Sequence, residues 1–486
     1  MADRPNLIFI MPDQLRADFL GYAGADFVQT PHIDRLAAAS MRYPRAYSTQ
    51  PICVPARASL LTGMNSLRTG VLDNGQWLRP DLAECGIRTW PELLSQAGYF
   101  TAGIGKMHFY PWDLRHGLQY RVVAEDKRWL QVRDDYYHHL RGHDHRKYHG
   151  NEHDGYHENK GAIVNKLPWE LSVDHFVGSE TCRFLETYGR EQPFALMVGF
   201  PGPHCPYDPN QEYLDKVDPA TMPRPIPAVA ANSGRLRRAN IEGNKRPWNG
   251  VDYSDFPDET KRTIRAHYAA SVMQIDDEIG AILQTLEAQG LADNTVIIFA
   301  SDHGDYLGDH DLIGKGHYYE TSIHVPMLAH IPGGPTGESN ALVELTDVTA
   351  TLLALAGVAP DHPLDARPLP GLGLPDSSPR EVITGFLAGG WMAYDGRWKL
   401  AKYATGDQHL FDRTADPDEQ VNRISDPTAQ ADLRRLDDIL TQTAMRATVL
   451  AHQDRRVYAA DLSSSPAFGK EGWQRPYPRG FDIQDE

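Results

Sequence analysis

Leu7-Ile8-Phe9-Ile10-Met11-Pro12-Asp13 begins with five consecutive apolar residues and ends in a proline and an acid. A short continuous apolar run of this kind is typical of a parallel strand that is buried on both faces of a sheet. Thr295–Ala300 repeats the pattern and leads into Ser301-Asp302, and residues 194–200 form a third run that leads into a turn of Pro, Gly and His residues. The three runs therefore predict three buried strands of one sheet.

Helical patterns alternate with these strands. Apolar residues recur at spacings of three and four over residues 258–291, and residues 342–358 predict a last helix, which is stopped by a glycine and a proline. Strands that alternate with helices over some 350 residues predict a layered α/β fold. Ligands of such sheets bind outside the carboxyl ends of the strands, so we expect Asp13, His204 and Asp302 to lie at one edge.

The C-terminal part of the chain has a different pattern. A stretch rich in Pro, Gly and Asp at 361–379 predicts a linker that follows a large body at 1–360. Short strand-like runs come next, at 380–386, 391–403 and 409–412. A charged helix near 429–452 follows these runs, so the sequence predicts a small α+β domain at 380–486.

The composition excludes some classes of protein. Among 486 residues, 48 are Lys or Arg and 65 are Asp or Glu, which gives a net charge of −17. This acidity argues against a nucleic-acid-binding protein, because phosphate backbones require clustered Lys and Arg, but a few buried cations can still bind an anionic substrate. No apolar stretch approaches the roughly 18 residues needed to cross a bilayer, so we expect no membrane partner.

The start of the chain and its cysteines bear on the compartment. The first residues lack the charged region, the long apolar stretch and the small-residue cleavage site of a secretory signal. If Met1 is the native start, we expect the protein in the cytoplasm. The four cysteines are widely spaced and form no Cys-x-x-Cys pair, which argues against a disulfide framework or a structural zinc site.

The segment Cys53-Val54-Pro55-Ala56-Arg57 is the strongest candidate for a reactive site. A lone cysteine is by default a buried structural thiol, but the setting of Cys53 argues against that interpretation. Pro55 suits the first turn of a helix, and Arg57 would lie one turn after Cys53 on the same face. A helix N-terminus with a nearby guanidinium stabilises an anion and activates a nucleophile.

Cys-x-Pro-x-Arg followed by Leu61-Thr62-Gly63 resembles the signature of the formylglycine-dependent (type I) sulfatases of the alkaline phosphatase superfamily, near the choline-sulfatase-like sulfatases and the phosphonate monoester hydrolases. The resemblance extends, in order, to Asp13-Gln14, to residues 30–36, to Gly105-Lys106-Met107-His108, to residues 301–305, to Lys315 and to residues 395–400. It implies an alkaline phosphatase-like fold, in which a large mixed and mostly parallel sheet is sandwiched by helices. It also implies that a formylglycine-generating maturation enzyme oxidises Cys53 to an aldehyde, whose hydrate is the nucleophile.

Two pairs of residues at predicted strand ends suggest a metal site. Asp13 with Gln14, and Asp302 with His303, can converge with Cys53 as ligands of one divalent ion. Oxygen-rich ligands favour Ca²⁺, Mg²⁺ or Mn²⁺. Many members of the family have Asp-Asp and Asp-Asn at these pairs, so this chain has two ligand carboxylates in place of three and gains an imidazole. Ca²⁺ is the first choice and Mn²⁺ the second, and simple strand-end caps are the alternative.

The resemblance also assigns roles to isolated residues. It implies that Lys106 contacts sulfate oxygens, as Arg57 does, and that His108 is the base for the second hydroxyl of the hydrate. His204 and Lys315 would hold the ester oxygen and assist the leaving alcohol. Asn74, 21 residues after Cys53, fits a contact to a substrate oxygen, although Asn-Gly is itself a turn signal. His204 also fits an ordinary turn histidine.

The predicted function is that of a sulfatase, which hydrolyses the sulfate ester of a small organic or sugar substrate to an alcohol and inorganic sulfate. A phosphonate monoester or phosphodiester hydrolase is the nearest alternative, because these esters also carry one negative charge. The Lys and His of Gly105-Lys106-Met107-His108 favour the sulfatase, since phosphonate hydrolases of this type commonly replace them. A non-catalytic binder of sulfate esters, in which Cys53 is never oxidised, is a third alternative.

Substrate choice is expected to depend on loops, with residues 113–168 and 219–249 as candidates. The partner expected at the site is a small-molecule or oligosaccharide sulfate ester, and a homo-oligomer is compatible with the sequence. Residues 136–157 contain seven of the 21 histidines, and we expect none of them to form a clean His-x-x-x-His pair on a helix face. We therefore expect a solvated excursion or a subunit contact there.

Overall fold

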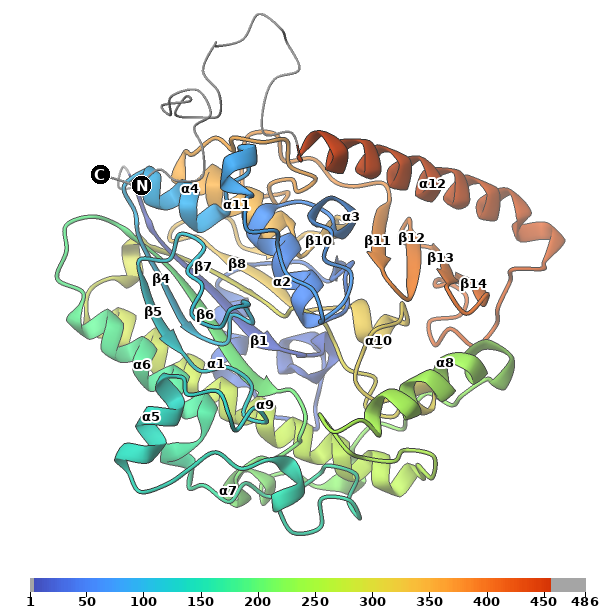
Figure 1. The fold of residues 1–486 in the computed structure, drawn as a ribbon, viewed down its shortest axis with the longest axis horizontal. Coiled ribbons are helices and arrows are strands. Elements are labelled where there is room, and N and C mark those ends of the chain that lie inside the picture. The colour runs from blue at the N-terminus through green and yellow to red at the C-terminus, as the bar shows by residue number, and fades with distance from the viewer. Residues whose placement is uncertain (1–3, 456–486) are drawn as a thin grey trace, which may run out of the picture.

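The computed structural model describes residues 4–455, which form an eight-stranded sheet with helices on both faces and a second, smaller sheet (Figure 1). The strand order in the large sheet is β5-β4-β6-β1-β7-β8-β2-β9. Its strands are β1 (Asn6–Asp13), β2 (Met41–Arg42), β4 (Phe100–Gly105), β5 (Tyr120–Val123), β6 (Phe194–Pro203), β7 (Thr295–Ala300), β8 (Met327–His330) and β9 (Gly337–Glu338). Neighbouring strands from β5 to β7 are parallel, whereas β8 is antiparallel to both of its neighbours.

Strand β1 is apolar throughout because it is buried on both faces of the sheet. Ile8 and Ile10 pack into the core on one face, whereas Leu7, Phe9 and Met11 pack into the core on the other. The first core contains helices α1 (Pro31–Ala38), α6 (Val173–Thr187) and α9 (Asp258–Ala288), and the second contains α2 (Cys53–Thr62), α4 (Trp90–Gln96) and α11 (Asp347–Ala356). The side chains of a strand alternate between faces, so one short sequence feeds both cores.

The structure confirms the predicted fold class and most of the predicted central elements. The three apolar runs form β1, β7 and β6, and the long helical pattern forms α9. The helix predicted over 342–358 is wrong at its start, because Val343–Glu344 form strand β10, which pairs in parallel with β3 (Ala46–Tyr47). The carboxylate of Asp347 accepts the backbone N–H of Glu344 at 2.9 Å, which starts the helix only at α11.

The smaller sheet is antiparallel and has the order β11-β12-β13-β14. Its strands are β11 (Ile383–Leu387), β12 (Gly390–Tyr394), β13 (Trp398–Tyr403) and β14 (Gln408–Asp412), and helix α12 (Gln430–Gln453) follows. The single run predicted over 391–403 is therefore two strands. The carboxylate of Asp395 accepts the N–H groups of Arg397 and Trp398, and Gly396 has φ 89°, which together close a tight turn between the strands.

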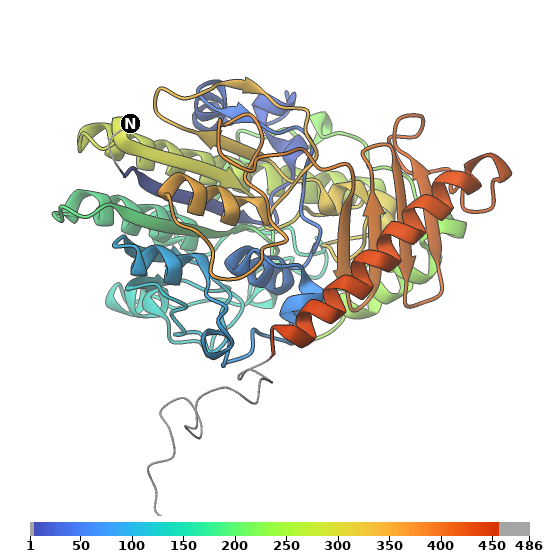
Figure 2. The same ribbon diagram turned by 90° about the horizontal axis from the view of Figure 1, so that it is seen from above.

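Both faces of the smaller sheet are covered. Helix α12 crosses one face, where Leu436 and Leu440 pack against Phe386 and Leu400 (Figure 2). On the other face the sheet shares a core with aromatic residues of the large body, among them Tyr306. The smaller sheet is therefore packed tightly against the large body formed by the first 360 residues.

The remaining helices are short or lie at the periphery. They are α3 (Ser66–Thr69), α5 (Asp135–Gly142), α7 (Gln211–Leu214), α8 (Ala230–Asn244) and α10 (Glu320–Ile323). The histidine-rich segment 136–157 consists of α5 and the turns after it. Across residues 4–455, no helix has both the length and the apolar character that a bilayer crossing requires.

Leu440 tests the packing between α12 and the smaller sheet. Leu440→Ala is expected to lower the free energy of unfolding by roughly 2–5 kcal/mol, because Leu440 is 1% exposed and the truncation leaves a cavity. Met445→Ala on the same helix is the matched control, since Met445 is 65% exposed. Urea unfolding measures both variants, and equal effects would contradict the described packing.

Candidate active site

Cys53 is the first residue of α2, which is buried over its whole length. The preceding residue provides no side-chain cap, and instead the side-chain oxygen of Asn74 accepts the N–H of Val54 at 3.0 Å. Pro55 lies in the first turn, as the sequence predicts, and the helix ends at Gly63 with φ 68°. Cys53 therefore lies at the positive end of the helix dipole, which favours an anion.

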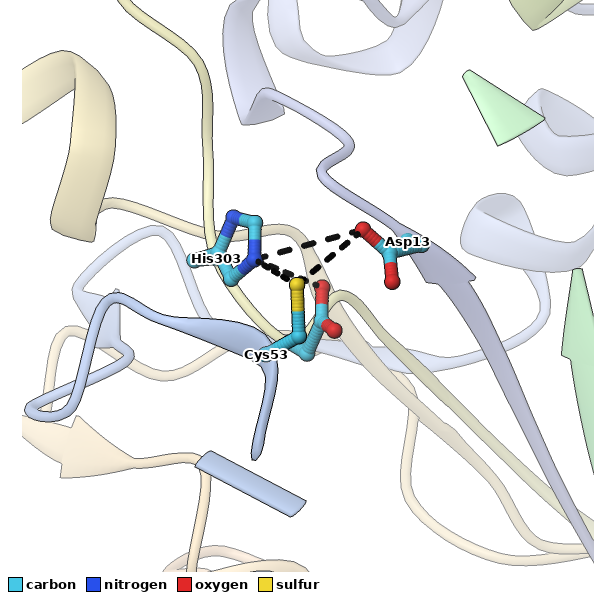
Figure 3. A group of neighbouring side chains, drawn as sticks. Asp13, Cys53 and His303 are labelled. Carbon is cyan, nitrogen blue, oxygen red and sulfur yellow. Dashed lines mark hydrogen bonds and ion pairs between the residues drawn. The ribbon is translucent and has the colours of Figure 1, made fainter. Parts of the chain in front are cut away.

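Side chains from two other segments converge on Cys53. One ligand atom from each of Asp13, Cys53, Asp302 and His303 lies within 4.8 Å of the others, and all four residues are buried. The Cys53 Sγ lies 3.1 Å from His303 Nε2 and 3.8 Å from Asp13 Oδ1 (Figure 3). Asp13 is the last residue of β1 and Asp302 follows β7, so the parallel strand ends bring them together, as the sequence predicts.

The donor set of this cluster fits a divalent cation. His303 Nδ1 donates a hydrogen bond to the Gly304 carbonyl at 2.9 Å, which leaves the lone pair of Nε2 facing the cluster. Two carboxylates and one imidazole are suitable ligands for a hard or borderline ion. The part of the chain that the structure describes therefore contains a buried group that can bind one metal ion.

Arg57 ties the two carboxylates of the cluster together. Its Nη2 lies 3.1 Å from Asp13 Oδ2 and 2.9 Å from Asp302 Oδ2, and its Nη1 donates to the Lys106 carbonyl at 2.7 Å. The Nζ of Lys106 lies 2.8 Å from the same oxygen of Asp13. Burial alone would raise the pKa of Asp13, but Lys106, His204, Lys315 and Arg57 hold it well below its ordinary value. Asp13 is therefore ionised.

Lys315 and His204 form a second group beside the cluster. The Nζ of Lys315 donates to Gln14 Oε1 at 2.6 Å and to His204 Nε2 at 2.7 Å. His204 Nδ1 in turn donates to the Cys205 carbonyl at 2.8 Å. Burial, followed by the charges of Lys315 and Arg128, lowers the pKa of His204 to about 3. His204 is therefore a neutral acceptor at ordinary pH, and Lys315 carries the proton of the pair.

Gln14 lies beside the metal-binding group, but its amide is already engaged. Its oxygen accepts from Lys315, its Nε2 donates to the Asp305 carboxylate, and its backbone N–H donates to Asp302 Oδ1 at 2.9 Å. Gln14 has φ 71°, which turns the chain sharply after β1. A metal would share the Gln14 oxygen with Lys315, and the role of Gln14 as a ligand stays a prediction.

The thiol of Cys53 is activated by its surroundings. Burial and Asp13 would raise its pKa, but Lys315, His303 and a hydrogen bond from His108 lower it well below the ordinary value. The His108 side chain therefore faces Cys53, and its Nδ1 is buried without a hydrogen-bond partner among residues 4–455. A thiol of this kind is a reactive group rather than a structural one.

The structure shows a structural contact for Asn74, which the sequence suggests as a substrate-binding residue. Its side chain is exposed, and its oxygen serves the N-terminus of α2 through Val54. Its contact with substrate stays a prediction, as do the roles assigned above to Arg57, Lys106, His108, His204 and Lys315.

Two acidic residues of the site, Glu125 and Asp126, are absent from the sequence-based candidates. Asp126 Oδ2 lies 3.9 Å from Lys106 Nζ and also binds the guanidinium of Arg128, and Glu125 binds backbone near His108. They follow the four-residue strand β5, which has no continuous apolar run to mark it. Two acids directly after the short apolar run Val122-Val123-Ala124 are the signal that could have indicated them.

A second group, His32, Asp276 and Asp277, also has the spacing of metal ligands. Asp276 is occupied otherwise, because its two oxygens accept the N–H groups of His32 at 3.1 Å and Ile33 at 2.7 Å. Asp276 therefore caps helix α1 from a neighbouring helix.

Comparisons with known proteins show the family of the chain. The family model described as Sulfatase matches residues 5–358, which is well over half of the chain. The protein therefore belongs to the sulfatase family, and it is a sulfuric ester hydrolase. The family resemblance and the enzyme class predicted from the sequence are confirmed.

The curated relatives cover nearly the whole chain. A choline-sulfatase of Rhizobium meliloti is 29% identical over 96% of this chain and 90% of its own length. An arylsulfatase of Clostridium perfringens is 31% identical over 87% of this chain and 90% of its own length. Among solved structures, a phosphonate monoester hydrolase of Agrobacterium radiobacter has a TM-score of 0.74 at 24% identity, over 93% of this chain and 96% of its own. That likeness supports the fold alone.

Metal addition tests the cluster around Cys53. A divalent ion that binds the folded protein at a hundredfold excess over its Kd is expected to add about 2.7 kcal/mol to the free energy of unfolding. The wild type should therefore have a higher Tm with Ca²⁺ or Mn²⁺ than with a chelator, and Asp302→Asn should lose this shift.

Asp277→Asn is the matched control for this experiment, because Asp277 belongs to the second acidic group. Its metal-induced shift should equal that of the wild type. A Tm shift that persists in Asp302→Asn and disappears in Asp277→Asn would show that the ion binds at the second acidic group and not beside Cys53.

Proposed function

We propose that the protein hydrolyses the sulfate ester of a small organic or sugar molecule with residue 53, converted to formylglycine, as its nucleophile. The observation that carries the proposal is the buried convergence of Cys53 with Asp13, Asp302 and His303, bridged by Arg57. An ordinary buried cysteine requires no such arrangement of charges.

The proposed cofactor is one divalent ion, with Ca²⁺ the first choice and Mn²⁺ or Mg²⁺ as alternatives. Asp13, Gln14, Asp302, His303 and residue 53 would hold it. When bound, the ion would act as a Lewis acid and lower the pKa of a hydroxyl at residue 53, and the hydrated aldehyde would supply two hydroxyls there. A serine or a thiol lacks the second hydroxyl.

Arg57 and Lys106 are proposed to hold the sulfate group. Both side chains are buried cations, with 0% and 1% exposure, at the N-terminal end of α2. Burial alone would lower the pKa of Lys106, but the neighbouring carboxylates of Asp13 and Asp126 raise it overall and keep Lys106 charged. Cations that are fixed in place before the reaction stabilise charge on the sulfate oxygens without reorganising.

Two different groups are proposed to handle protons. Lys315 carries the proton of the Lys315–His204 pair, so it is the donor to the leaving alcohol, and His204 holds its ammonium in place. His108 offers the unpartnered Nδ1, which can take a proton at residue 53 after the alcohol has left.

A phosphonate monoester or phosphodiester hydrolase is the second candidate. The equal charge of the two ester types supports it, and a phosphonate monoester hydrolase shares the fold. Lys106 and His108 favour the sulfatase. Several features stay predictions: the specificity loops at 113–168 and 219–249, a maturation enzyme as partner, a homo-oligomer and a cytoplasmic location. The division of the chain into 1–360, 361–379 and 380–486 also stays a prediction, and its last part extends beyond the described residues.

The mass of the tryptic peptide 46–57 tests the nucleophile. In protein from its native host, or made with a maturase, Cys53 is expected to have lost its thiol and gained an aldehyde that a hydrazine probe traps. Cys53→Ala is expected to reduce kcat by a factor on the order of 10³ or more, because the nucleophile is removed. An intact thiol in fully active protein would overturn the proposed chemistry.

A comparison of two substrates tests the class of ester. The kcat/KM for 4-nitrophenyl sulfate is expected to exceed that for a 4-nitrophenyl phenylphosphonate in the same metal-loaded preparation. Lys106→Ala should reduce the sulfatase rate more than the phosphonate rate. Equal or reversed efficiencies of the wild type would support the second candidate instead.

A further inference from the structure

The carboxylate of Glu125 binds the backbone of the segment that carries His108. Its Oε1 accepts the N–H of Met107 at 3.2 Å, and its Oε2 accepts the N–H of His108 at 3.0 Å. Glu125 is 0% exposed, so water does not compete for these bonds. Two successive N–H groups that converge on one carboxylate form an anion-binding nest.

The backbone at His108 requires this support. His108 has φ 59°, in the left-handed region that costs free energy for a residue with a β-carbon. Such a conformation persists only where its surroundings determine it. The ring of His108 therefore depends on bonds to its own backbone for its place beside residue 53.

Arg121 completes the arrangement on strand β5. Its guanidinium lies 3.6 Å from Glu125 Oε1 and 5.0 Å from the centre of the Phe109 ring. Its Nη1 also donates to the Trp112 carbonyl at 2.9 Å. The carboxylate and its counter-ion thus hold the segment after His108 as well as the segment before it.

From these contacts we infer that Glu125 is a positioning residue for His108. The inference rests on the proposed function, in which His108 takes a proton at residue 53. Glu125 acts on the turnover of the enzyme through the backbone of residues 107 and 108, and it does not touch the substrate.

Glu125→Gln separates this role from a merely structural one. The amide keeps only one acceptor oxygen, so it loses the 3.0 Å bond from the His108 N–H to Oε2 and retains at most the two 3.2 Å contacts to Oε1. Its NH₂ group presents hydrogen atoms to the remaining N–H or to Arg121. The variant is measured in metal-loaded protein whose aldehyde content is verified. Its kcat for 4-nitrophenyl sulfate should fall about 10- to 100-fold, because a catalytic group is misplaced, while KM stays within about threefold of the wild type. The first turnover should release a burst of 4-nitrophenol equal to the enzyme concentration, because His108 is needed only after the alcohol leaves.

The chain offers a matched control in Asp276. Its buried carboxylate also accepts two successive backbone N–H groups, those of His32 and Ile33, at the start of α1. Asp276→Asn should lower the Tm to a similar extent and leave kcat, KM and the absence of a burst unchanged. If Glu125→Gln does not fold, Glu125→Asp replaces it in the test. Its shorter side chain keeps the charge beside Arg121 but moves the carboxylate away from the backbone N–H groups, so it should give the same lower kcat, similar KM and burst.

A double mutant tests the route of the effect. In the background of His108→Ala, Glu125→Gln should produce no further loss of kcat, because residues that act as one unit are not additive. Additive losses, or kinetics of Glu125→Gln that equal those of Asp276→Asn, would overturn the inference. A wild type that carries the aldehyde and the metal but does not hydrolyse sulfate esters would instead overturn the proposed function, and the inference with it.

Discussion

The contact of the Arg57 guanidinium with Asp13 and Asp302 is the interaction on which the site depends. Two carboxylates side by side in a buried place repel each other and lose their hydration, which costs several kcal/mol per uncompensated charge. Arg57 lies between them, with 2.9 Å and 3.1 Å contacts to one oxygen of each. The same contact fixes α2 to the ends of β1 and β7, and so it places Cys53, one turn earlier, against the other oxygen of Asp13.

The site contains several buried cations, although the chain as a whole is acidic. The protein has a net charge of −17, yet Arg57, Lys106 and Lys315 converge around residue 53 within a wall of apolar strands and helices. Buried charges in a low dielectric act far more strongly than exposed ones. An acidic surface therefore does not determine which substrate binds, because the local cations set the potential at the site.

The elements that the sequence predicts well are those with a strong apolar signal. Strands β1 and β7 are continuous apolar runs, and helix α9 has apolar residues at spacings of three and four. The acids at the ends of the two strands follow from the geometry of parallel sheets. The two-residue strand β10 has no period at all, so its pairing with β3 and the late start of α11 depend on tertiary contacts. Motif resemblance indicated Cys53, Lys106 and Lys315 but not Glu125, because Glu125 acts on backbone N–H groups that any sequence supplies. Its one trace in the sequence is the pair of acids that follows Val122-Val123-Ala124.

The smaller sheet contributes to the site, although its strands lie far from the site in sequence. The loop that carries Lys315 is held before the lysine by Asp305, which accepts the N–H of Gly314 at 2.8 Å. After the lysine, the N–H of Tyr318 donates to the Tyr403 hydroxyl at 3.2 Å, and the Tyr318 hydroxyl donates to the Gly390 carbonyl at 3.0 Å. Both of these partners belong to the smaller sheet.

A lysine with four rotatable bonds keeps a 2.7 Å contact to His204 only if its backbone is fixed on both sides. Asp305, in the segment after β7, supplies the first anchor of that loop, and the smaller sheet supplies the second. Lys399 of β13 adds to the second anchor, since its ammonium lies 3.2 Å from Glu320, just beyond the loop. Lys315, the proposed proton donor, is therefore positioned jointly by the segment after β7 and by the smaller sheet, so the C-terminal part of the chain supports the candidate site.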